Sequence, residues 1–110
     1  LVGSCKEGLG QKVFEEWITG ASKPEDLITR IKTDFQLGGH KAAAIAMVLE
    51  RANIKLVSEM DEDFVRSIFL EPCADLQTAL DTALAEQGQD AGIIIMPFGG
   101  STLPILSCSL

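Results

Sequence analysis

The chain is poor in aromatic residues and in positive charge. It contains five Phe, one Trp and no Tyr, so a hydrophobic core must be built mainly from Ala, Leu, Ile and Val. Nine Lys and Arg residues stand against sixteen Asp and Glu residues, which gives a net charge of −7. Nucleic-acid phosphates are bound by clustered Lys and Arg, and the basic residues here are scattered, so no nucleic-acid partner is expected.

Long hydrophobic runs are absent, and cysteine is scarce. No apolar run reaches the roughly 18 residues of a membrane span and no secretory leader is evident, so no membrane partner is expected. The three cysteines, Cys5, Cys73 and Cys108, are an odd number that fits reduced thiols in a cytoplasmic protein better than a disulfide framework. One histidine with such scattered cysteines also lacks the spacing of a zinc site, so no metal site is expected within the chain.

Helical and strand-like segments alternate along the 110 residues. The helical spacing of apolar residues predicts helices over about 13–20, 22–31, 40–52, 61–67 and 75–87. Short apolar stretches predict a strand ending at Val2, strands over 54–57 and 68–70, and most clearly a strand over 91–96. This alternation predicts one α/β domain spanning residues 1–110: a three-layer, Rossmann-like fold with a short, mostly parallel sheet of three to four strands flanked by helices.

The topology predicts where the informative residues meet. In a parallel sheet with right-handed crossovers, the loops that leave the strands lie at one edge, where ligands bind. The loop Gly3–Gly10, the loop after Val57 and the loop after Met96 should share that edge. The helix that begins near His40 should start there as well, because a crossover helix runs antiparallel to the strand that it feeds. We therefore expect a hollow that contains Lys41 together with free backbone N–H groups suited to an anion.

Each of these features also has a plain structural interpretation. Glycine loops at strand ends are usually simple turns, a lone histidine at a helix start is usually a cap or surface residue, and Cys5 is favoured as a structural thiol. Lys41 falls in line with Ile45 and Val48, so it must either reach out to solvent or point into a pocket. From the residues alone, an enzyme wall, a non-enzymatic small-anion or nucleotide-binding regulatory module, and a packing domain remain open.

Three stretches together resemble a known family. They are Cys5–Gly10 (CKEGLG), Asp34–Ala42 (DFQLGGHKA) and Met96–Pro104 (MPFGGSTLP), and in order and spacing they are similar to the C-terminal domain of the nickel-dependent lactate racemase family. The resemblance implies that the chain is the C-terminal, cleft-forming domain of a larger two-domain protein. It also implies that a separate N-terminal domain is the partner and holds a nickel-pincer nucleotide, so that no cofactor is expected in the isolated domain.

The resemblance also assigns roles to individual residues. Lys41, with His40 and Gln36 nearby, would contact the carboxylate of a small 2-hydroxy acid. The cofactor side of the cleft would be formed by Phe98, Gly99 and Gly100, together with Gly8 and Gly10 of the first glycine loop. No catalytic residue is implied within this chain, except His40 as an auxiliary group. The parent protein would then be a racemase or epimerase, and the isolated domain would be inactive.

Overall fold

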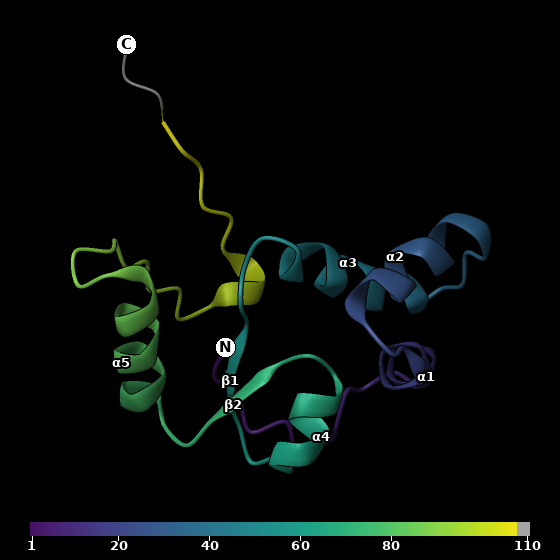
Figure 1. Ribbon diagram of the computed structural model, residues 1–110, viewed down its shortest axis with the longest axis horizontal. Helices are drawn as coiled ribbons and strands as arrows, with labels where there is room; N and C mark the ends of the chain where they lie inside the picture. Colours follow the sequence, from purple (N-terminus) through teal and green to yellow (C-terminus); the bar gives the residue numbers. More distant parts are fainter. Residues whose placement is uncertain (108–110) are drawn as a thin grey trace.

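The computed structural model describes residues 1–107, which contain five α-helices and two short β-strands (Figure 1). In chain order the elements are α1 (Lys12–Gly20), α2 (Pro24–Thr33), α3 (Gly39–Leu49), β1 (Lys55–Val57), α4 (Glu62–Ser67), β2 (Glu71–Cys73), α5 (Leu76–Gln87) and a 3-10 turn, η1 (Gly99–Ser101). Cys108 lies outside the described residues. No helix within residues 1–107 has both the length and the apolar character needed to cross a membrane.

The sheet is parallel but smaller than predicted. β1 and β2 pair in parallel, with Leu56 opposite Pro72, and Val2 forms an isolated parallel bridge to Val57. The α/β class and the parallel pairing are thus confirmed. The expectation of three to four strands is wrong for the described residues, which form a two-stranded sheet, and the three-layer Rossmann-like arrangement is not confirmed.

The strand predicted over residues 91–96 accounts for most of that difference. This segment has no strand pairing, and Ile93, Ile94 and Ile95 are 56%, 73% and 83% exposed. A fully apolar strand is stable when both of its faces are covered. Here no strand pairs with the segment and its side chains stay exposed, so its apolar character alone does not make it a strand.

The hydrophobic core lies among α1, α2, α3 and Ile68 at the end of α4. Trp17, Ile18 and Leu27 are almost fully buried, and the alanines of α3 let its axis come close to its neighbours. The closest approach is at Gly39, where an added Cβ would lie 2.5 Å from Cε2 of Trp17. Ala42, Ala43 and Ala46 follow Gly39 at helical spacing and are also buried.

The inward-facing side of α3 therefore differs from the one expected. The sequence predicts a buried stripe that includes Ala44 and Val48, yet both are exposed in the structure. Lys41 and Val48 lie on the outer side of the helix, where Val48 is 50% exposed, whereas Ile45 between them is half-buried and packs against the core.

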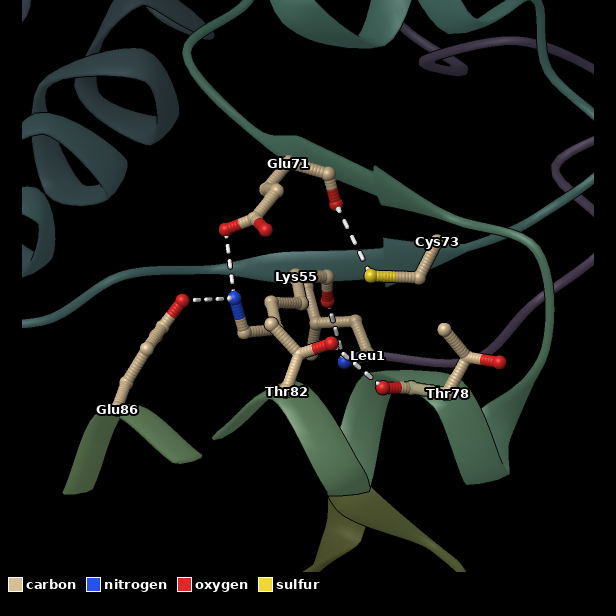
Figure 2. Close-up of polar contacts among 7 residues, drawn as sticks. All are labelled: Leu1, Lys55, Glu71, Cys73, Thr78, Thr82 and Glu86. Atoms are coloured by element: carbon tan, nitrogen blue, oxygen red, sulfur yellow. Dashed lines mark hydrogen bonds and ion pairs between the residues drawn. The ribbon is translucent and has the colours of Figure 1, made fainter. Parts of the chain in front are cut away.

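α5 is attached to the sheet by half-buried side chains, among them Leu80 and Leu84, and by one charged contact. None of its residues is fully buried. Lys55 of β1 has a side chain only 10% exposed, and its Nζ lies 2.6 Å from Glu71 Oε2 and 3.0 Å from Glu86 Oε1 of α5 (Figure 2). The hydrogen bond to Glu71 raises the pKa of Lys55 above its ordinary value and outweighs the opposing effect of burial; Glu86 adds to the rise.

Candidate functional site

Two of the expected loops do meet at the carboxyl edge of the sheet. The backbone N–H of Glu59, just after β1, donates to the Ser4 carbonyl at 3.3 Å. The two loops enclose a hollow of about 380 Å³, lined by Ser4, Cys5, Lys6, Gly8, Glu59, Met60, Asp61 and Phe64. Lys6 and Glu59 form a long ion pair of 3.9 Å across it, and both side chains are exposed.

The first glycine loop reaches this edge through left-handed backbone conformations. Cys5, Gly8 and Gly10 have φ of +53°, +70° and +77°. Such values favour glycine, because it has no Cβ to clash with the backbone. No atom lies within 4 Å of a Cβ added to Gly8 or Gly10, so the backbone of this loop is open to a ligand.

The start of α3 is fixed by the turn that precedes it. Gly38 has φ of +100°, and a Cβ there would lie 2.7 Å from Nε2 of Gln11, so the helix start packs directly against the end of the first loop. The Gly38 N–H donates to His40 Nδ1 at 3.0 Å, and the His40 ring stacks on Phe35 at a centroid distance of 6.2 Å. The Nε2 side of the imidazole is therefore the side left for an external group.

Gln36 and Lys41 lie on either side of this turn. The Gln36 Oε1 accepts a hydrogen bond of 2.9 Å from Nε1 of Trp17, which holds its side chain against the core. Lys41 is exposed in the first turn of α3 and forms no ion pair with another residue in the range 1–107. The hollow at the carboxyl edge is lined by Gly8 but not by Lys41 or Gly10.

The second glycine pair lies in η1. Phe98 is 78% exposed, and its carbonyl accepts hydrogen bonds from Ser101 N and Thr102 Oγ1 at 2.9 and 2.8 Å. Nothing lies within 4 Å of a Cβ added to Gly99 or Gly100. None of the hydrogen bonds found in residues 1–107 joins this turn to the first loop or to Lys41.

The acid and thiol groups do not form a metal site. Within residues 1–107 there is no group of three or more His, Cys, Asp or Glu side chains that could hold a metal ion. The ionisable cluster that the sequence analysis missed is the one around Lys55. A lysine inside an otherwise apolar strand was the available sign of it, but its two carboxylate partners are 16 and 31 residues away.

These features define a small α/β domain, with a glycine-rich loop at the carboxyl edge of its sheet and an exposed lysine in the first turn of α3. The model of the lactate racemase C-terminal domain family matches residues 1–103, and the chain belongs to that family. The chain is 25% identical over 108 residues to the lactate racemase of Thermoanaerobacterium thermosaccharolyticum, an alignment that covers 94% of this chain and 25% of that protein.

A solved structure supports the same fold. The lactate racemase apoprotein from Thermoanaerobacterium thermosaccharolyticum superposes with a TM-score of 0.81 at 23% identity, over 93% of this chain and 26% of the other. The chain thus spans about a quarter of the length of the curated relative that it matches.

Proposed function

We propose that this chain is the C-terminal wall of the active site in a lactate racemase-like enzyme that acts on a small 2-hydroxy acid. The observation that carries the proposal is the family match over residues 1–103. The fold likeness to a lactate racemase supports it. The remaining parts of the site come from the parent's N-terminal domain, which is the chain's partner in this proposal.

Lys41 is the proposed carboxylate-binding residue. Its ammonium group is exposed and has no competing carboxylate partner among residues 1–107. It lies in the first turn of α3, where the helix dipole favours a bound anion. In the proposed site, His40 precedes Lys41 on α3 and Gln36 lies before the Gly38 turn, where its hydrogen bond from Trp17 fixes its side chain. In this arrangement Lys41 binds and orients the substrate, and His40 presents Nε2 as an auxiliary hydrogen-bonding group.

The open turns provide the cofactor side of the site. In the proposed enzyme, Gly8, Gly10, Gly99 and Gly100 let a flat nucleotide group approach the backbone, and Phe98 covers it from solvent; the free space around all four glycines fits such a group. When bound, a nickel-pincer nucleotide supplies a hydride acceptor for the hydroxyl-bearing carbon. Because residues 1–107 hold no cluster of metal-binding side chains, the nickel donors belong to the N-terminal domain in this proposal.

Replacing Lys41 by Ala in the full-length parent tests the assignment. The loss of a charged hydrogen-bond donor to a carboxylate should raise KM for the 2-hydroxy acid by about tenfold to a hundredfold. Lys32→Ala is the matched control, because Lys32 is also exposed but lies on α2. Racemisation rates and substrate binding that are unchanged by Lys41→Ala would contradict the role. A parent that binds nucleotides but racemises no 2-hydroxy acid would instead indicate the regulatory module.

A further inference from the structure

The sheet has one edge that is chemically blocked. The Glu71 N–H donates to the Ile54 carbonyl at 2.9 Å, so Glu71 directs its backbone groups toward β1. Backbone direction alternates along a strand, so Pro72 directs its backbone groups away from β1, to the outer edge of β2. Proline has no N–H to donate there, and this lack protects an edge against strand addition.

The opposite edge is open. Val57 donates to the Leu1 carbonyl at 2.9 Å and accepts from the Gly3 N–H at 3.0 Å, on either side of Val2. The N–H and C=O of Val2 therefore point away from β1, and its side chain is 65% exposed. This edge has both the donor and the acceptor that a further parallel strand requires.

The position of α5 indicates which way the chain continues. Lys55 bonds to Glu86 of α5, and side chains alternate along a strand, so α5 covers the face opposite to that of Leu56. Figure 1 shows α5 on one side of the β1–β2 pair and α1 to α4 on the other. The crossovers from Val2 to β1 and from β1 to β2 advance in one direction with their helices on the same face. The connection through α5 has its helix on the opposite face. Because such crossovers are right-handed, this connection must move toward the other edge of the sheet, past Val2.

The geometry points to residues 92–96 as the strand that docks on the Val2 edge, in parallel with β1. Ile93, Ile94 and Ile95 are β-branched and exposed, as a strand segment without a neighbour would be. Residues 88–91 form the link from α5, which falls within the usual length of about two to six residues for such loops.

Docking would also move the second glycine turn. A parallel strand at the Val2 edge ends at the carboxyl edge of the sheet, so Phe98, Gly99 and Gly100 would lie beside the hollow lined by Ser4 and Gly8. The significance of that placement for a cofactor rests on the proposed function, but the strand placement itself does not.

Disulfide trapping in the full-length parent tests the placement directly. Val2→Cys is combined in turn with Ile93→Cys, Ile94→Cys and Ile95→Cys, and cross-links formed under mild oxidation are mapped by mass spectrometry. Neighbouring side chains of a strand point to opposite faces, so efficient cross-linking should alternate along the three positions. An absence of cross-links at all three positions, or equal trapping at all three, overturns the proposal.

Hydrogen exchange in the same parent gives a second test that involves no activity. Val2→Pro removes the outward donor but no bond to β1, whereas Val2→Ala keeps the donor. We expect amides in 92–96 to exchange about tenfold faster in Val2→Pro than in Val2→Ala, with Val57 and Cys73 still protected. Fast exchange in the unsubstituted parent, or protection that survives Val2→Pro, overturns the proposal. Because neither readout depends on Lys41 or on turnover, a failure here is distinct from a failure of the proposed function.

Discussion

At the residue scale, the contact between Gly39 and Trp17 determines how the helical core is assembled. A side chain at position 39 would overlap the indole ring, which is buried by α1, α2 and α3 and lies 4.0 Å from the Arg30 guanidinium. The absence of a Cβ at this position therefore sets the distance between α1 and α3.

Gly39→Ala should destabilise the chain. The added methyl must displace the Trp17 ring, and overpacking of this kind costs about 1 to 3 kcal/mol. Gly20→Ala is the matched control, because nothing lies within 4 Å of its added Cβ and its φ is not positive. Urea unfolding followed by circular dichroism measures both variants; equal midpoints would show that the core accommodates the methyl group.

Lys55 should make stability depend on alkaline pH. Its pKa is raised in the folded state, first by Glu71, so its contribution is complete below the ordinary value of 10.5. That contribution is lost as the pH rises through the higher, folded-state pKa. Thermal unfolding between pH 9 and pH 12 should therefore show a loss of stability that is smaller in Lys55→Met. Lys12→Met, which removes an exposed partner of Glu16, is the control and should retain the full loss.

At the element scale, α4 and α5 were the most predictable helices, because a capping carboxylate marks where each begins. Asp61 accepts from the Phe64 N–H and Asp75 accepts from the Thr78 N–H, so α4 and α5 begin where the sequence indicates. The strands were less predictable, because a strand is defined by its partner. Residues 91–96 have strand composition without a paired neighbour, and β2 begins at Glu71, one residue after the predicted 68–70 stretch.

Asp75 should control the start of α5. Hydrogen bonds from Thr78, first from its backbone N–H and then from its hydroxyl, lower the pKa of the Asp75 carboxyl. The stabilisation is present above the ordinary pKa of 3.8 and is lost as the pH falls through the lowered value. Asp75→Ala should therefore speed amide exchange in the first turn of α5 at pH 7. Asp75→Asn should retain the cap, but its contribution should no longer depend on pH. Identical exchange in the unsubstituted chain, Asp75→Ala and Asp75→Asn would show that Asp75 does not cap α5.

At the scale of the whole molecule, the two halves of the chain differ in how they are held. α1, α2 and α3 enclose an apolar core, whereas α5 and the segment after it carry large exposed apolar side chains, among them Leu76, Ile95 and Leu106. The sequence was sufficient to predict the convergence of the first loop and the loop after β1, because parallel topology requires it. It could not place Lys41 on the outer side of α3, because the Gly39–Trp17 contact is tertiary.

The isolated chain should expose more apolar surface than the parent. We expect 1-anilinonaphthalene-8-sulfonate to fluoresce more strongly with the 110-residue chain than with an equal molar amount of the parent, because in the proposed function the N-terminal domain of the parent covers this side. The chain alone should also catalyse no racemisation. Measurable turnover by the isolated chain would contradict its role as one wall of a larger site.

The sole tryptophan has a practical consequence for following how this molecule comes apart. Trp17 is 1% exposed. It contacts Arg30, Gln36 and Gly39, which all lie between the start of α2 and the start of α3. Its intrinsic emission therefore reports on the packing of α1, α2 and α3, and we expect it to be insensitive to the unfolding of α5. We expect α5, none of whose residues is fully buried, to unfold before this core, so that Trp17 emission alone would record only the later transition while far-ultraviolet ellipticity would also register the loss of α5.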